Sequence, residues 1–435
     1  MAFGIAPRPI TAFKEIRALP QGHTLTVQES GSTTLSQYWS IPTNTQVSNL
    51  AFDEASELLE HELENAVTRR LVSDVPLACF LSGGIDSTLM TALAARSAGT
   101  LTGFTLGLPE ARSDQHELAN ATALAKRHRV DHIIHRMNPE ELRHDFSVWT
   151  EGFEEPCGHA PANYFLSKSV SSYGIRVALN GLGGDELFGG YHWYSYRNFP
   201  IQRGSKVLSL AASLMPEGGL RKALSLSKAS TPTQLHTILF QRNSDTLLKN
   251  IFSQHLWPSR STPEIVDDLY AKERTFTDRT EAFNYLDLMN YVGNHHVHRT
   301  DQFTMACSLE GRFPLLDHNL IEAAFKVPSH LKVAGSHRKI ILKKIAKKHI
   351  PESCLTMPKR GFTVPLKTWV ERDLRDFTQK NLESLIDRPE MNSAQIRKFS
   401  QAFRARKLNP LLAWHLCALQ LWFERFIDPG VPSIT

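Results

Sequence analysis

The sequence predicts an α/β fold: a parallel, doubly wound sheet with helices on both faces, followed by a mostly helical C-terminal part. Three observations predict it. Short apolar runs alternate with helical segments through the first half of the chain. Two glycine-rich loops, 82–87 and 180–191, directly follow two of these runs. The strand-like runs then fade from about residue 194 onward.

The first 45 residues predict short extended pieces joined by turns, because a Pro/Gly turn precedes an alternating run within 18–27. This piece is too short to hold a hydrophobic core of its own. A helix is expected over 53–71, because apolar residues recur there at helical spacing on one side. These residues are Leu58, Leu59, Leu63, Ala66 and Val67.

The alternating region predicts a parallel sheet covered on both faces. Ligands of such sheets bind at the carboxyl ends of the strands, where both glycine-rich loops fall. Strands are expected over 76–81, 101–106, 130–135 and 175–179. Helices are expected over 87–97 and 115–128, between 139 and 173, and later over 233–252, 281–293 and 411–426.

Composition excludes several classes of protein. At 435 residues the chain exceeds the size of one growing core, so two or more units are expected. The net charge of +5 is too small and too scattered to indicate nucleic-acid binding. No apolar stretch is long enough for a membrane span, and the N-terminus lacks the apolar core of a secretory signal. The five cysteines show no CxxC pairing, which favours a reducing compartment. We therefore expect a cytoplasmic protein.

The first glycine-rich loop reads Ser82-Gly-Gly-Ile-Asp-Ser87. Gly83 and Gly84 let the backbone approach a polyanion, and the following helix N-terminus directs free N–H groups and a positive dipole end at it. Asp86 beside phosphates requires a divalent cation, which predicts a Mg²⁺ ligand. The alternative is a strand-to-helix turn capped by Asp86 and Ser87. The loop lacks the Lys-Ser/Thr of a Walker A motif and resembles the PP-loop of ATP pyrophosphatases.

The second loop, 180–191, contains two adjacent acids among glycines. Asp185 could share a metal ion with Asp86, and Glu186 could order the metal shell or a neighbouring base. The alternative is a glycine-rich surface turn with two solvated acids. Since both loops end strands of one predicted sheet, we favour a shared nucleotide and metal site.

The run Gly183-Gly-Asp-Glu-Leu-Phe-Gly-Gly-Tyr191, together with the first loop, resembles the synthetase domain of the asparagine synthetase B family, and the resemblance extends over most of residues 1–370. Further matching segments are Glu154-Glu-Pro with Pro161 and Tyr164-Phe-Leu166, Arg299-Thr-Asp301 with Met305, Glu310-Gly-Arg-Phe-Pro-Leu-Leu-Asp317, and Pro351 with Lys359-Arg-Gly-Phe362, Pro365 and Trp369.

This resemblance implies roles for individual residues. It assigns to the ATP pocket Leu81, Leu106, Asn180 and Gly181. It assigns to pyrophosphate and Mg²⁺ Ser82, Gly83, Gly84, Asp86 and Ser87, with Asp185 as a further metal ligand. Lys339 corresponds to the family's catalytic lysine, whose ammonium would stabilise negative charge that grows on the α-phosphate. The alternative for Lys339 is a solvated helix lysine.

The implied reaction has two steps. A carboxylate, aspartate being the first guess, attacks the α-phosphate of MgATP and gives an acyl-adenylate and pyrophosphate. An amine such as ammonia then expels AMP and forms an amide. The adenylate must be kept from water, so a closed pocket is expected. The expected units are a glutaminase-domain remnant over 1–45, the ATP-binding core over 50–195 and a helical part over 196–435.

Two departures from the family bear on the substrates. Glutaminase domains of the family start with a cysteine nucleophile, whereas here Ala2 follows Met1 and no cysteine precedes Cys79, so we expect no glutaminase activity in this chain unless the gene starts upstream. Nitrogen would come from ammonia, another amine or a separate glutaminase subunit, and a homodimer is left open. Leu182 replaces an acidic residue, or a tyrosine in β-lactam-forming members, and leucine can neither accept a proton nor bind ammonium. Either Glu186 does that work or the substrates differ. A different PP-loop adenylase and a degenerate ATP-binding fragment are the competing hypotheses.

Overall fold

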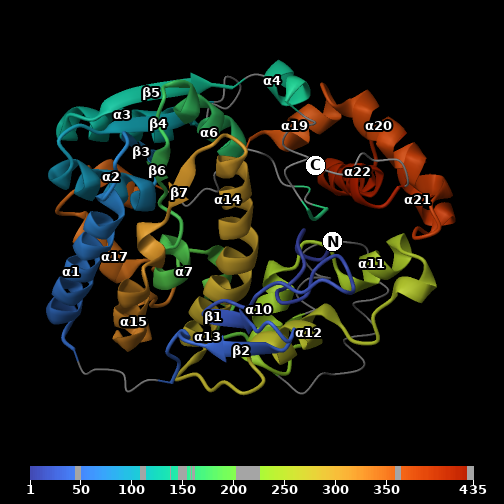
Figure 1. Ribbon diagram of the computed structural model, residues 1–435, viewed down its shortest axis with the longest axis horizontal. Helices are drawn as coiled ribbons and strands as arrows, with labels where there is room; N and C mark the ends of the chain where they lie inside the picture. The colour runs from blue at the N-terminus through green and yellow to red at the C-terminus, as the bar shows by residue number, and fades with distance from the viewer. Residues whose placement is uncertain are drawn as a thin grey trace.

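A five-stranded, all-parallel sheet lies at the upper left of the molecule in Figure 1. The computed structural model describes residues 1–44, 50–107, 114–137, 139–145, 154–156, 158, 162–201, 226–357 and 364–428. The strand order is β5-β4-β3-β6-β7. The strands are β3 (Leu77–Phe80), β4 (Thr102–Gly107), β5 (Asp131–Arg136), β6 (Val177–Leu179) and β7 (Glu310–Arg312).

The order of the strands reverses between β3 and β6. From β3 the chain moves outward through β4 to β5, and then returns to the other side of β3 with β6. Cys79 of β3 aligns with Leu179 of β6, so the two loops that follow these strands begin at the same level. Such a reversal leaves a crevice at the carboxyl ends of the strands, where ligands of open α/β sheets bind.

Two hydrophobic cores cover the two faces of the sheet. Successive side chains of a strand point to opposite faces, and accordingly Cys79 and Leu81 belong to one core whereas Ala78 and Phe80 belong to the other. The fold therefore confirms the predicted doubly wound α/β class.

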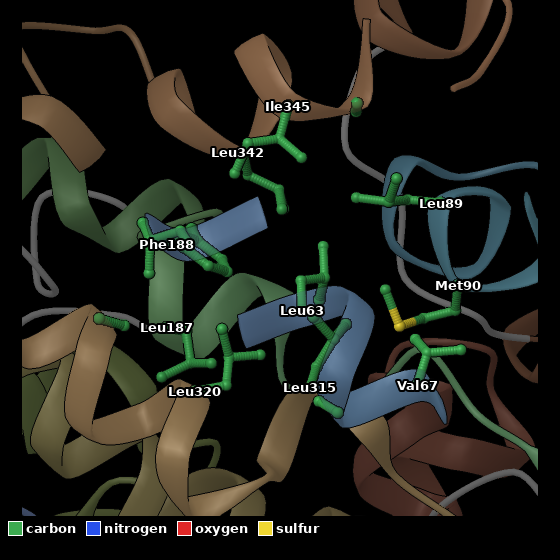
Figure 2. Packing of buried hydrophobic residues seen from close by; sticks show 14 of the residues in the cluster. Leu63, Val67, Leu89, Met90, Leu187, Phe188, Leu315, Leu320, Leu342 and Ile345 are labelled. Carbon is green, nitrogen blue, oxygen red and sulfur yellow. The ribbon is translucent and has the colours of Figure 1, made fainter. Parts of the chain in front are cut away.

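The first core packs against helices from both halves of the chain. Figure 2 shows Leu63, Leu89, Phe188, Leu315 and Ile345 in it, contributed by segments far apart in the sequence. Its main helices are α1 (Phe52–Leu71), α2 (Ile85–Ser97), α3 (Asp114–His128), α15 (His318–Lys326) and α17 (Ile340–Ala346). The expected apolar side of α1 is its buried side, since Leu59, Leu63, Ala66 and Val67 are buried.

The second core takes up much of the C-terminal part. Its helices are α6 (Ala162–Ser172), α14 (His298–Met305), α19 (Leu366–Glu371), α20 (Arg375–Ser384), α21 (Ser393–Arg404) and α22 (Pro410–Phe426). In Figure 1, α19 to α22 gather at the upper right in orange and red. The sheet residues Phe80 and Phe104 share this core with Trp414 and Phe423 of α22. The C-terminal part is thus helix-rich, as predicted.

The N-terminal 44 residues lack a core of their own. A two-stranded antiparallel ribbon, β1 (His23–Val27) and β2 (Thr33–Gln37), lies away from the central sheet (Figure 1). Phe3 and Ile41 are buried in the first core, and the Phe3 ring stacks on Phe240 with 5.0 Å between centroids.

Some elements differ from the predicted ranges. The helix expected over 233–252 is two helices, α10 (Pro232–Phe240) and α11 (Asp245–Ile251). The helix expected over 281–293 begins as α13 (Arg279–Leu286) and continues as a π-helical segment, η3 (Asp287–Val297), into α14. π-Helical geometry is rare and is often found at functional sites. The other helical segments are α4 (Pro139–His144), α7 (Gly184–Phe188), η1 (His192–Tyr196), η2 (Gln254–Leu256), α12 (Thr262–Tyr270), η4 (Pro314–Leu316), α16 (Ser329–Lys332), α18 (Glu352–Thr356) and η5 (Leu385–Asp387).

Four of the five cysteines lie in the described part of the chain. Cys79, Cys307, Cys354 and Cys417 are free thiols, and Cys157 lies outside the described part of the chain. Among the helices that the structure describes, none has the length and apolar character that a bilayer span requires.

Candidate active site

A cavity of about 460 Å³ opens at the carboxyl ends of β3, β4 and β6. It lies at the strand-order reversal, where the fold favours a ligand site. The predicted residues that line it are Leu81, Ser82, Gly84, Asp86, Ser87, Leu106, Asn180, Gly181, Asp185 and Lys339. Gly83 and Glu186 are not among its lining residues.

The first glycine-rich loop turns tightly between β3 and α2. Gly83 has φ +78°, and a Cβ there would lie 2.0 Å from the Glu117 carbonyl oxygen, so only glycine fits. Gly84 caps α2 without a side-chain hydrogen bond, which leaves the first N–H groups of a 13-residue helix beside the cavity. The Ser82 and Ser87 hydroxyls lie 2.9 Å apart and fix the loop. Such a helix N-terminus favours an anion.

The second loop packs directly on the first. A Cβ on Gly181 would lie 2.7 Å from the Ser87 nitrogen, and one on Gly184 would lie 2.3 Å from Asp86 Oδ1. A Cβ on Gly190 would lie 1.9 Å from Asp185 Oδ1 and 2.3 Å from Lys339 Cε. Glycine is therefore required at these positions for the two loops to approach each other. Because these residues have no side chain, Asp86 and Asp185 can come close together.

Lys339 joins the two loops electrostatically. Its Nζ lies 2.8 Å and 2.6 Å from the two carboxylate oxygens of Asp86, and 2.7 Å from Asp185 Oδ1. The three side chains are 7%, 14% and 7% exposed, in the order Lys339, Asp86, Asp185. Two carboxylates and one ammonium leave an excess of one negative charge in a buried cluster.

The cluster fits a divalent cation. A single ammonium already contacts both carboxylates, so the two acids lie close enough together to share one cation. Carboxylate oxygens are ligands that Mg²⁺ prefers, usually together with phosphate oxygens and water. Asp86 and Asp185 are accordingly the residues that would hold Mg²⁺.

Lys339 has a left-handed backbone, with φ 54°, at the N-cap of α17. Its own N–H donates to the Phe188 carbonyl oxygen at 3.2 Å, which ties α17 to the second loop. Left-handed φ is uncommon for a residue with a Cβ, and such strain concentrates at functional sites. The predicted alternative of a solvated lysine does not fit a side chain that is 7% exposed.

Glu186 lies behind the cavity wall rather than in it. It is 1% exposed, and its Oε1 accepts a hydrogen bond from Tyr191 Oη at 2.5 Å. Burial, reinforced by the neighbouring charge of Asp185, raises the pKa of Glu186 to about 8. Its carbonyl oxygen also accepts from Asn284 Nδ2 at 2.5 Å. Tyr191 stands between Glu186 and the cavity, so the acid supports the second loop from within the protein.

The cavity lining also includes polar residues to which the sequence assigned no role. Asn163 enters from α6, Tyr291 and His296 from η3, and Arg299 and Thr300 from α14. Arg299 Nη2 donates to His296 Nδ1 at 2.9 Å, and Asn163 Nδ2 donates to Thr300 Oγ1 at 2.7 Å. Arg299 and Thr300 belong to the R-x-D motif that supports the family resemblance. That motif is the sequence signal that could have pointed to these two residues.

Leu182 lines the cavity and packs against the first core. Its N–H donates to Asn180 Oδ1 at 3.0 Å, which holds the loop in place. The position thus contributes an apolar surface and no proton acceptor. The matching segments at 161 and 359–362 lie outside the described residues.

Comparison with known proteins gives a consistent result. The asparagine synthase family model matches residues 58–424. Asparagine synthetase [glutamine-hydrolyzing] 1 of Bacillus subtilis (strain 168) is 28% identical over 391 residues, covering 88% of this chain and 61% of that protein. A putative asparagine synthetase [glutamine-hydrolyzing] of Mycobacterium bovis is 26% identical over 455 residues, covering 99% and 67%.

A more distant relative carries a different name. Amidase chyE of Penicillium rubens is 25% identical over 430 residues, covering 86% of this chain and 63% of that protein. Across the three relatives, the chain spans 61% to 67% of their own length.

Proposed function

This chain belongs to the asparagine synthase family, and from that premise we propose that it is an ATP-dependent carbon–nitrogen ligase. It would convert a carboxylate to its adenylate and then join the acyl group to an amine. The observation that carries the proposal is the position of Lys339, held between Asp86 and Asp185 where two glycine-rich loops meet a helix N-terminus.

In the first step a carboxylate oxygen of the substrate attacks the α-phosphorus of ATP. The bond from that phosphorus to the bridging oxygen of the β-phosphate breaks, and pyrophosphate leaves. Ser82, Gly84 and the N-terminus of α2 bind and orient the phosphates. Lys339 offers its ammonium to the negative charge that grows on the α-phosphate. Asp86 and Asp185 would hold Mg²⁺, which would supply positive charge to neutralise the phosphates.

In the second step an amine nitrogen attacks the acyl carbon of the adenylate. The acyl–oxygen bond breaks, AMP leaves, and the nitrogen gives up one proton. Leu182 and the cavity walls exclude water, which would otherwise hydrolyse the adenylate. Since the pocket wall holds apolar Leu81 and Leu106 beside Asn180 and Gly181, these residues are proposed to hold the base and sugar of ATP.

Aspartate and ammonia are the first candidate substrates, and asparagine the first candidate product. Two relatives that are named asparagine synthetases support this choice. Leu182 favours a second candidate, an amide-forming enzyme that acts on another carboxylate or amine, because leucine cannot receive the proton of an incoming ammonium ion. The relative named an amidase is consistent with such variety. A separate glutaminase subunit remains a candidate nitrogen donor.

Carboxylate-dependent exchange of labelled pyrophosphate into ATP tests the first step by itself. We expect exchange with one member of a carboxylate panel that includes aspartate, and AMP formation once an amine is added. Asp86→Asn should abolish exchange, since it removes a carboxylate from the metal site, and should leave the circular dichroism spectrum unchanged. Asp387→Asn, an acid outside the cavity lining, serves as the matched control and should retain exchange.

Two results would contradict the proposal. The first is wild-type protein that binds MgATP but shows no pyrophosphate exchange with any carboxylate of the panel. The other is full exchange in Asp86→Asn, which would exclude the metal role of this residue.

A further inference from the structure

The π-helical segment η3 supplies part of the cavity lining. Its residues Tyr291 and His296 line the cavity, with 4.5 Å between the centroids of their rings. A π-helix is wider than an α-helix, because each N–H bonds the carbonyl five residues back rather than four. The choice between the two geometries therefore decides where residues 291–296 point. Since π geometry over eleven residues is rare, specific contacts must favour it here.

The first residue of η3, Asp287, is held by three hydrogen-bond donors. Its buried carboxylate accepts from His236 Nε2 and Tyr194 Oη, each at 2.7 Å, and from Trp193 Nε1 at 3.3 Å. The Trp193 ring also packs edge-on against Tyr291, with 5.3 Å between centroids. Because the start of η3 is fixed in this way, a change of helical geometry must move the residues that follow.

Gly293 favours the wider turn from within η3. A Cβ at this position would lie 2.7 Å from the Leu288 carbonyl oxygen, which is closer than a Cβ can approach a backbone oxygen. Glycine is among the least favourable residues in an α-helix, whereas alanine is the most favourable. The observed geometry at residue 293 thus requires glycine, and the same glycine makes the competing α-helix less stable.

Gln21 holds the same turn from outside. Its Nε2 donates to the Met289 carbonyl oxygen at 3.3 Å and to Asn294 Oδ1 at 2.9 Å. The two acceptors belong to residues five positions apart, which is the spacing of one π turn. A Cβ on Gly293 would lie 3.2 Å from Gln21 Nε2, so glycine also makes room for this contact. Neither Gln21 nor Gly293 is among the lining residues of the cavity.

We infer that Gly293 and Gln21 are positioning residues that keep η3 in π geometry and thereby place Tyr291 and His296 in the cavity. The inference rests on the proposed function, because it gives both residues an effect on the adenylation step. It also gives the N-terminal segment a task. That segment has no core of its own, yet through Gln21 it acts on the geometry of the site.

Gly293→Ala tests the inference most directly, because alanine favours the α-helix and its Cβ does not fit the π turn. Pyrophosphate exchange with the carboxylate panel should fall about 10–100-fold, since misplaced groups orient the reactants poorly. The thermal midpoint should stay within about 3 °C of wild type, which separates lost positioning from lost folding. Gly99→Ala is the matched control and should change neither quantity, because a Cβ there would meet nothing within 4 Å.

Gln21→Met keeps the length of the side chain and removes both donated hydrogen bonds. It should also lower the exchange rate, whereas Gln401→Met, a change of an exposed glutamine in α21, should not. The double variant with Gly293→Ala should lose no more activity than Gly293→Ala alone, because both changes act on one turn. Losses that multiply in the double variant would show two independent roles and contradict the inference.

Crystal structures of wild type and Gly293→Ala report the helical geometry without any assay of activity. In the variant, residues 287–297 should be α-helical and Tyr291 should leave the cavity. If this change is seen while wild type shows no exchange, the role of Gly293 in shaping the cavity stands and the proposed function falls. A π-helix that persists in Gly293→Ala overturns the inference. Full exchange in a variant whose η3 has become α-helical overturns it as well.

Discussion

Lys339 carries two costs at once: a left-handed backbone and a nearly full burial of its ammonium. A left-handed residue with a Cβ costs about 1–2 kcal/mol. The surrounding structure over-determines this conformation, because the Lys339 N–H is bonded to Phe188 and its Nζ to both acids. Strain retained in this way is expected where the side chain has a chemical task.

Replacing the ammonium tests that task. In Lys339→Gln the rate of pyrophosphate exchange should fall about 10²–10³-fold, the loss typical of removing one group that stabilises transition-state charge. The Kd for MgATP should change much less, because the glycine loop and the N-terminus of α2 still bind the phosphates. Exchange kinetics and calorimetry measure the two quantities. An unchanged exchange rate with a weakened Kd would make Lys339 a binding residue only.

At the residue scale, the sequence could indicate Asp86, Asp185 and their glycines, because each stands in a short loop after a predicted strand. Glu186 shows the limit of that reasoning: it is adjacent to Asp185 in sequence, yet the turn into α7 directs it into the protein. Arg299 and Tyr291 could not be found by spacing. They lie at least 100 residues beyond the second loop and reach the cavity through the packing of a long helical segment.

At the scale of elements, one carboxylate connects two helices of the first core. Asp317 caps α15 by accepting from the Asn319 N–H, and the same side chain accepts from Arg69 and Arg70 in the last turn of α1, at 2.7 Å and 3.0 Å. Burial alone would raise the pKa of Asp317, but the hydrogen bond and charge of Arg69 outweigh it, so the pKa lies below its ordinary value. Folding therefore favours the ionised form.

The sign of this shift gives a pH dependence. A carboxyl whose pKa is lowered by folding contributes stability above its unfolded pKa of about 3.9 and loses it as the pH falls through the folded value. Asp317→Asn keeps a good helix cap and loses the charge. It should lower the free energy of unfolding by about 1–2 kcal/mol at pH 7, a moderate figure because both arginines are partly exposed. The difference from wild type should stay constant down to about pH 4 and shrink below it.

Urea denaturation between pH 7 and pH 3.5 measures this difference. Glu64→Gln provides the comparison, since it breaks an exposed pair with Arg96 and should change the free energy of unfolding by less than about 0.5 kcal/mol. A difference for Asp317→Asn that grows with acidity would contradict the assigned direction of the pKa shift.

The elements that sequence patterns predicted are those with strong periodicity. The apolar runs of β3 to β6 and the helices α1 to α3 fall near the expected ranges. β7 escaped prediction, because Glu310-Gly-Arg312 is short and polar and becomes a strand only by pairing with β6 at the sheet edge. The π-helical turn of η3 also escaped, since the same residues show ordinary helical spacing and tertiary packing selects the wider turn.

At the scale of the whole molecule, the expected boundary near residue 195 does not divide the hydrophobic cores. β7 comes from the second half of the chain and completes the sheet, and α22 completes the core behind β3 and β4. The strand-like pattern fades near residue 194, and nothing in that pattern could show that the two halves share both cores. The cavity is likewise built from both halves of the chain, because its lining residues come from segments between Phe80 and Met357.

This shared architecture predicts how nucleotide binding affects stability. A ligand that binds only the folded state adds about 2.7 kcal/mol at 100 times its Kd. If both cores unfold together, the entropy of unfolding of a chain of 435 residues converts this gain into a rise of about 3 °C in one thermal transition. Scanning calorimetry with MgATP measures it, and Asp86→Asn is the control with weakened metal binding. We expect a single shifted transition, because helices from both halves of the chain cover the two faces of the sheet. Two separate transitions, of which MgATP shifts only one, would instead show that the halves unfold independently.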